Sequence, residues 1–272
     1  MSLLSYERHR AEIVEQTELV RAAVEGVDLA VPVATCPGWT LGALLRHIAG
    51  AHSWVETIVR TRAQEQVPED VVNDVAGDDG VAASEVAARL VDGARRLADA
   101  LGDAGPHAPV WTVAPGGTPE FWARRMAHET AVHRYDVARA VSAARGVDAG
   151  YEIAPDLAAD AFDEWMGFGT LPQVLEPEPG VPTLLGPGRT LCFRATDGAP
   201  GRPADWTVDL TGPAVTWEHF AREDAAVAVR GPVTGLVLML YGRRSAAHPI
   251  EVTGDESLLK EWLARTGGWL NE

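Results

Sequence analysis

The 272-residue sequence is poor in lysine and rich in acidic side chains. Lys260 is the only lysine, so arginine supplies nearly all of the 23 basic residues, and the formal net charge is −16. Proteins that bind nucleic acid or an anionic membrane need a basic surface, which releases counterions on binding. The composition therefore argues against both kinds of partner.

Long apolar runs and paired cysteines are also lacking. No apolar run approaches the ~18 residues that a membrane-spanning helix requires, and the start, MSLLSYERHR, reaches charged residues too early for a signal peptide. Cys36 and Cys192 cannot form a disulfide framework and belong to no CxxC pair, which disfavours thiolate zinc sites and dithiol redox chemistry. We expect a cytoplasmic protein, either a monomer or a homodimer.

The length and the change in residue pattern near residue 148 indicate two domains. Thr40 is an expected N-cap, and Thr118-Pro119-Glu120 has the residue types of a helix start. Apolar spacing predicts helices over residues 6 to 29, 41 to 61, 82 to 101 and 118 to 146. Four helices of this length predict a four-helix bundle over residues 1 to 148.

Residues 149 to 272 have the pattern of a small α+β domain. A short helix is expected over residues 156 to 166, a buried helix over 232 to 241 and a closing helix over 255 to 265. Between them lie segments of strand character: TLCFRAT, DWTVDLT, AVTWEHF, AAVAVRG and IEVTG. A further short strand, VWTV, is expected at residues 110 to 113 of the first domain.

The fourth predicted helix places ionisable side chains where apolar ones are expected. Its inward stripe contains a carboxylate and an imidazole one turn apart, because the residues at steps of three and four are Trp122, Met126, Glu129, His133, Val137 and Ala140. Burying an unpartnered carboxylate is costly. The stripe therefore predicts either a Glu129–His133 ion pair or a metal ion with a third ligand from another helix.

The second predicted helix offers His47 or His52 as that third ligand. Each lies on its own apolar stripe, and five residues at 100° each separate the two side chains by about 140°. They are therefore not expected to bind the same ion. Helical spacing alone leaves the choice between them open.

Two longer stretches, CPGWTLGALLRHIAGAH and RRMAHETAVHRYDVA, resemble the mycothiol-dependent maleylpyruvate isomerase family. The resemblance implies an N-terminal bundle of the DinB-like type. It extends to VRGPVTGLVLMLYGRRS, which is similar to that family's small second domain, related to sterol carrier proteins. Both halves of the chain are thus covered.

The resemblance implies which residues form the site. It places the metal ligands at His47, Glu129 and His133, and it makes Arg243 the best match for an arginine that assists catalysis. The donor set suits zinc, and three protein ligands leave room for a further one. Asp136 is a candidate for orienting a ligand, or else an exposed ion-pair partner. His128 lies off the stripe and is expected at the bundle surface or in a loop contact.

The implied activity depends on a thiol cofactor, mycothiol. A metal-activated thiol adds to a cis double bond of a small electrophile, the bond rotates, and elimination gives the trans isomer. Two alternatives remain open: a mycothiol S-transferase that acts on electrophiles in detoxification, and a non-catalytic protein that binds a metal or small ligand. The roles of His52 and Arg244 also stay open.

Overall fold

The structure is a computed structural model that describes residues 4–69, 81–172, 183–198, 201 and 204–267. The chain divides into two compact units, Leu4–Tyr151 and a second that begins at Glu152. Parts of two expected loops, after residue 67 and after residue 171, lie outside the described residues. The domain boundary at residues 148 and 149 stays a prediction.

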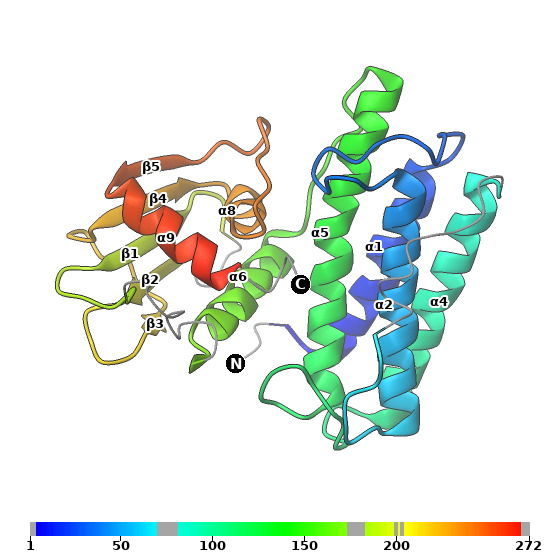
Figure 1. Cartoon of the computed structure of the whole chain (residues 1–272), viewed down its shortest axis with the longest axis horizontal. Helices are drawn as coiled ribbons and strands as arrows, with labels where there is room; N and C mark the ends of the chain where they lie inside the picture. The colour runs from blue at the N-terminus through cyan, green and yellow to red at the C-terminus, as the bar shows by residue number, and fades with distance from the viewer. Residues whose placement is uncertain (1–3, 70–80, 173–182, 199–200, 202–203, 268–272) are drawn as a thin grey trace. The chain divides into compact units, whose positions relative to one another are not determined.

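In the described part of the first unit four long helices are present, as expected, and they run side by side (Figure 1). They are α1 (Tyr6–Ala23), α2 (Leu41–Thr61), α4 (Ala83–Ala104) and α5 (Pro119–Arg145). The ends follow local chemistry, since the Thr40 hydroxyl caps α2 by accepting from the Ala43 amide and Pro119 occupies the first turn of α5. Helix α1 packs against α4 and α5, and α2 packs against the same two helices.

Two predicted features of the first unit are wrong. Helix α1 ends at Ala23, before the expected end near residue 26 or 29, although Val24 and Val27 remain in the core. The apolar pattern thus continues past the helix into a turn. Residues 110 to 113 form no strand: the amide of Val110 bonds to Gly117 and that of Trp111 to Ala63, so no ladder to one neighbour develops.

The second unit is α+β, also as predicted. A sheet of five strands has the order β3-β2-β1-β4-β5, in which β1 and β4 are parallel and the other neighbours antiparallel. Among the residues that the structure describes, three helices accompany it (Figure 1). The elements are α6 (Pro155–Gly169), β1 (Thr190–Ala195), β2 (Asp205–Asp209), β3 (Thr216–Glu218), β4 (Val227–Gly231), α8 (Val233–Leu240), β5 (Glu251–Gly254) and α9 (Glu256–Thr266).

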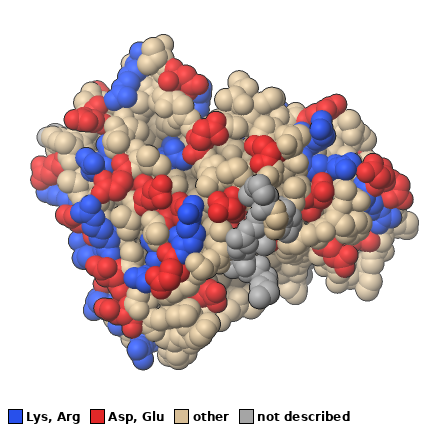
Figure 2. Space-filling model, turned by 180° about the vertical axis from the view of Figure 1, so that it is seen from behind, with Lys and Arg blue, Asp and Glu red and all other residues tan. Residues whose placement is uncertain are grey.

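The surface has a mixed charge pattern. In Figure 2, acidic and basic side chains are interspersed over the visible face. Several ion pairs join two side chains of the same helix, such as Arg89 and Glu85 at 2.6 Å. Among the described residues, no helix combines the length and the apolar character needed to cross a bilayer.

Candidate metal centre

Helix α5 presents Glu129 and His133 one turn apart on the side that faces α2. The apolar members of the predicted stripe are buried, with Trp122 at 1% and Val137 at 0% exposure. Glu129 Oε1 lies 2.9 Å from His133 Nε2. Glu129 and His133 are thus in ion-pair contact, as the first of the two alternatives predicts, and both side chains are largely enclosed.

On helix α2, the side chain of His47 lies close to both Glu129 and His133. Its Nε2 lies 3.7 Å from Glu129 Oε1, and its ring centroid lies 5.1 Å from that of His133. One donor atom from each of the three residues falls within 4.8 Å of the others. The structure thus brings together His47, Glu129 and His133, the set that the resemblance implies. Metal binding by these residues stays a prediction.

His52 lies on another side of α2 and is absent from this group. It is buried, and its Nε2 lies 2.9 Å from the Thr130 hydroxyl oxygen. Burial lowers the pKa of His52 to about 4, so the ring is neutral at pH 7. Its position agrees with the angular separation expected for two histidines five residues apart.

Arg125 holds the second oxygen of Glu129, a contact that the sequence analysis missed. Its Nη2 lies 2.8 Å from Glu129 Oε2, and the arginine is 5% exposed. Oε1 is left to face the two histidines, so the carboxylate is oriented for one-oxygen binding. The signal was available, because an arginine four residues before a glutamate on a helix lies on the same face.

Charges within the cluster are strongly coupled. Burial raises the pKa of Glu129, but the charge of His133, hydrogen bonds from His133 and His47, and the charge of Arg125 outweigh it and hold this pKa well below its usual value. Burial lowers the pKa of His133, but Glu129 and hydrogen bonds with Asp136 and Cys36 raise it well above the ordinary value. The metal-free pair is therefore ionised on both sides.

Asp136 is buried and faces the other ring nitrogen of His133. Its Oδ2 lies 2.9 Å from His133 Nδ1 and the residue has no exposed surface, so the alternative of an exposed ion pair is wrong. His128 is also buried, at 1% exposure, and its ring meets that of His9 on α1 at 5.7 Å. The expected surface position of His128 is therefore wrong, because α5 is enclosed around most of its circumference.

The segment before α2 contributes two further neighbours that the sequence analysis missed. The Trp39 ring lies 4.9 Å from the ring of His47. Cys36 Sγ lies 3.5 Å from Asp136 Oδ2. Spacing along the sequence carries no signal for either contact, because the turn and α5 are about 100 residues apart.

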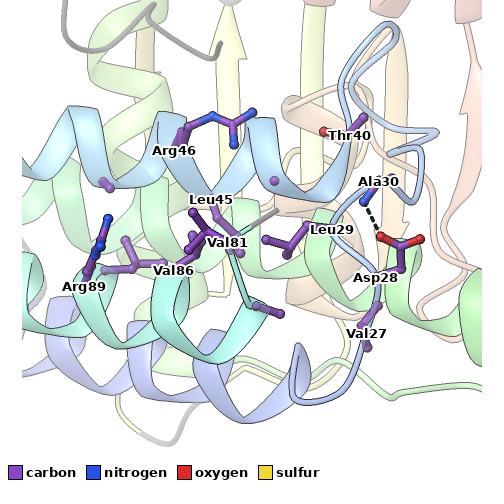
Figure 3. Close-up of a pocket in the computed structure, with 14 residues that line it drawn as sticks. Val27, Asp28, Leu29, Ala30, Thr40, Leu45, Arg46, Val81, Val86 and Arg89 are labelled. Atoms are coloured by element: carbon purple, nitrogen blue, oxygen red, sulfur yellow. Dashed lines mark hydrogen bonds between the residues drawn. The ribbon is translucent and has the colours of Figure 1, made fainter. Parts of the chain in front are cut away.

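A cavity of about 800 Å³ lies on a different side of α2, toward α4 (Figure 3). Its wall is apolar at Leu29, Leu45 and Val86, with Arg46 and Arg89 at the edge. None of the three clustered residues lines it. The cavity is therefore separate from the candidate metal centre.

Arg243 and Arg244 follow α8 in the second unit. Arg243 is half-buried, and its Nη1 donates to the Tyr241 carbonyl oxygen at 2.6 Å. Arg244 is exposed. The bond to Tyr241 assigns no role to Arg243, so its catalytic role stays a prediction.

The donor atoms in the first unit fit a divalent metal. Two imidazole nitrogens and one carboxylate oxygen form a common zinc ligand set, and three protein ligands are typical of catalytic zinc sites. Both histidines and the glutamate are only partly exposed, at 16%, 11% and 22% of their side chains. A fourth ligand can therefore reach the cluster from solvent.

Comparisons with known proteins cover both units. Residues 10–138 match the mycothiol maleylpyruvate isomerase N-terminal domain, and residues 156–261 match the C-terminal domain of the same proteins. None of the curated proteins matches the sequence.

Two solved structures share the fold. One is the mycothiol-dependent maleylpyruvate isomerase, with a TM-score of 0.55 and 15% identity. The other is a variant of that enzyme with one histidine replaced by alanine, with a TM-score of 0.60 and 14% identity. Each comparison covers 92% of this chain and 95% of the other.

Proposed function

The chain belongs to the mycothiol-dependent maleylpyruvate isomerase family, a family of enzymes, and on that premise we propose that it catalyses a thiol-dependent cis-trans isomerisation with a bound divalent metal, zinc being the best fit. One observation carries the proposal. Donor atoms of His47, Glu129 and His133 converge within 4.8 Å from two helices.

The protein groups have separable tasks in this reaction. His47, Glu129 and His133 hold the metal, and Arg125 keeps one glutamate oxygen away from it. A bound divalent cation lowers the pKa of a coordinated thiol, so that the thiolate is available near neutral pH. The neutral ring of His52 adds no competing positive charge beside the cluster.

The thiol, of the mycothiol class, supplies reversible addition to an activated cis double bond, which rotates while single and re-forms on elimination. The thiol is both the nucleophile that forms the C–S bond and the group that leaves when this bond breaks, so the protein needs no nucleophile of its own. Arg243 binds a substrate carboxylate through two parallel hydrogen bonds, for which a planar guanidinium is suited. The substrate is therefore a small unsaturated acid.

The first test is the metal content per chain, by elemental analysis of the full-length protein and of a His47→Ala, Glu129→Ala double variant. We expect about one zinc in the parent and none in the variant, with the helical circular dichroism retained. A Glu85→Ala, His107→Ala variant is the matched control, since both side chains are exposed in the same unit and outside the cluster. Parent protein that stays metal-free after zinc loading would refute the proposal.

The second test is turnover of maleylpyruvate by the zinc-loaded protein with and without mycothiol. Isomerisation that requires the thiol supports the proposal. A thioether product that accumulates with the thiol consumed identifies a transferase instead. Zinc binding without turnover of maleylpyruvate or of model electrophiles identifies a non-catalytic metal-binding protein.

Arg243 is tested against its neighbour. Lysine keeps the charge but not the two parallel hydrogen bonds, so Arg243→Lys should lower kcat/KM by roughly tenfold or more, about 1.4 kcal/mol or above. Arg244→Lys is the matched control and should leave kcat/KM within twofold. Equal effects of the two substitutions would remove Arg243 from the site.

A further inference from the structure

Asp136 occupies a position between a candidate metal ligand and a cysteine. Its Oδ2 lies 2.9 Å from His133 Nδ1 and 3.5 Å from Cys36 Sγ. The carboxylate is completely enclosed. Two side chains that are 97 residues apart in the sequence thus share one buried oxygen.

The chemistry of these groups sets the direction of both hydrogen bonds. Asp136 Oδ2 accepts from the Cys36 thiol, and an accepting carboxylate oxygen pairs with an N–H, so the hydrogen of its second contact lies on His133 Nδ1. When His133 is neutral, its lone pair is then on Nε2, the atom 2.9 Å from Glu129 Oε1. Asp136 therefore selects the tautomer in which the metal-facing nitrogen is the free one.

The segment that carries Cys36 also contacts the other histidine. It is folded by hydrogen bonds from the Val33 amide to the Trp39 carbonyl at 2.9 Å and from the Cys36 amide to Val33 at 3.0 Å. The Trp39 ring lies 4.9 Å from that of His47. One short turn thus contacts His47 through Trp39, and both Asp136 and His133 through Cys36.

We propose that Asp136 is the positioning residue of the metal centre, fixing His133 as the Nδ1–H tautomer, and that the Cys36–Trp39 turn holds Asp136 and His47 in place. The proposal rests on the proposed function, because it concerns the affinity for the metal. Cys36 acts through the carboxylate and is not a ligand, although its sulfur, His133 and Asp136 also lie within 4.8 Å of one another.

The first experiment measures zinc affinity by competition with a chromophoric chelator, using the full-length protein. Loss of a hydrogen-bond partner of a ligating histidine costs about 10- to 100-fold in metal affinity, so we expect that loss for Asp136→Ala. Asp136→Asn keeps an accepting oxygen and should lose less. Cys36→Ser keeps a donor and should stay within about threefold. Asp148→Ala, at an exposed acid beyond α5, is the control and should match the parent.

The second experiment reads the tautomer directly. Long-range ¹H–¹⁵N spectra of the zinc-loaded parent should show His133 protonated at Nδ1, with a slowly exchanging proton. Asp136→Asn, which preserves the shape of the side chain, should bring this proton into faster exchange even if Asp136→Ala does not fold. A general loss of packing would speed proton exchange at many sites and not at the His133 ring alone.

The outcomes separate this inference from the proposed function. If the parent binds no zinc, the proposed function fails and this inference fails with it. If the parent binds zinc while both Asp136 variants bind it within twofold and keep the slow Nδ1 proton, only the positioning role is refuted. A sulfur-to-cadmium charge-transfer band in the cadmium-loaded parent that disappears in Cys36→Ser would make Cys36 a ligand and overturn the arrangement proposed for it.

Discussion

The burial of the His52 ring leads to a quantitative prediction about the free energy of unfolding at acidic pH. The Thr130 hydroxyl donates its single hydrogen to the Met126 carbonyl at 2.7 Å, so His52 Nε2 must be the donor in its 2.9 Å contact with Thr130. The neutral Nε2–H tautomer is thereby fixed. Among the described residues, Nδ1 has no hydrogen-bond partner, and protonation there places a charge in a buried position.

The magnitude follows from the two pKa values. Burial lowers the pKa of His52 to about 4 in the folded protein, whereas an unfolded chain has an ordinary histidine pKa of about 6.5. The unfolded state therefore takes up the proton first, and stability falls as the pH drops from about 6.5 toward 4. The loss from this one group is about 2 kcal/mol at pH 5 and about 3 kcal/mol at pH 4.

The assay compares urea unfolding at pH 7.5 and pH 5 for metal-free parent and His52→Gln, followed by helical circular dichroism. Glutamine keeps an N–H donor for Thr130 and does not titrate, so the parent should lose about 2 kcal/mol more than the variant over this interval. Contributions from Glu129 and His133 are common to both and cancel. Equal losses would mean that the folded protein accommodates the protonated ring, and the reasoning would be refuted.

Three other predictions concern the ligands and the second unit. Because the pKa of His133 is raised, metal binding at neutral pH must displace its proton, so zinc affinity in chelator competition should rise with pH, by up to about tenfold per unit. Arg125→Met leaves Glu129 Oε2 without this donor and should lower zinc affinity by about tenfold in the same assay. Gly235→Ala should lower Tm, because the new methyl group meets the backbone of His248 at a cost of about 1–3 kcal/mol, which outweighs a helix-propensity gain of about 1 kcal/mol.

Each of these has a control. Zinc affinity that does not change between pH 6 and pH 8 would contradict a protonated His133. Arg60→Met changes an exposed arginine of α2 and should leave zinc affinity unchanged. If it lowered zinc affinity as much as Arg125→Met does, the cause would be the change in net charge. Gly167→Ala lies on α6 with open space around the new methyl group and should be neutral or stabilising.

Local sequence signals predicted the elements that carry the site. The Thr40 cap and the Pro119 start define α2 and α5 through contacts within a few residues, which is why both were correctly placed. The spacing of Glu129 and His133 follows from the helix alone. Choosing His47 over His52 needed the resemblance, because the packing of α2 on α5 is a tertiary contact.

Contacts between distant segments could not be predicted. Cys36 and Trp39 reach the cluster through an irregular turn, whose path depends on non-local packing. His128 was misplaced because an amphipathic pattern assumes one buried face, whereas α5 contacts α1, α2 and α4. Apolar residues after Ala23 extended the first predicted helix, since burial at Val24 and Val27 does not require helical backbone.

The candidate ligands and the side chains that orient them all belong to the first unit, whereas Arg243 belongs to the second. On the proposed function, metal binding and substrate selection are therefore assigned to different units of the chain. If Arg243 binds the substrate carboxylate as proposed, substitutions in the second unit would alter which small acid is selected while leaving every group of the candidate metal centre unchanged. Such a division would let the choice of substrate change while the proposed thiol chemistry stays the same.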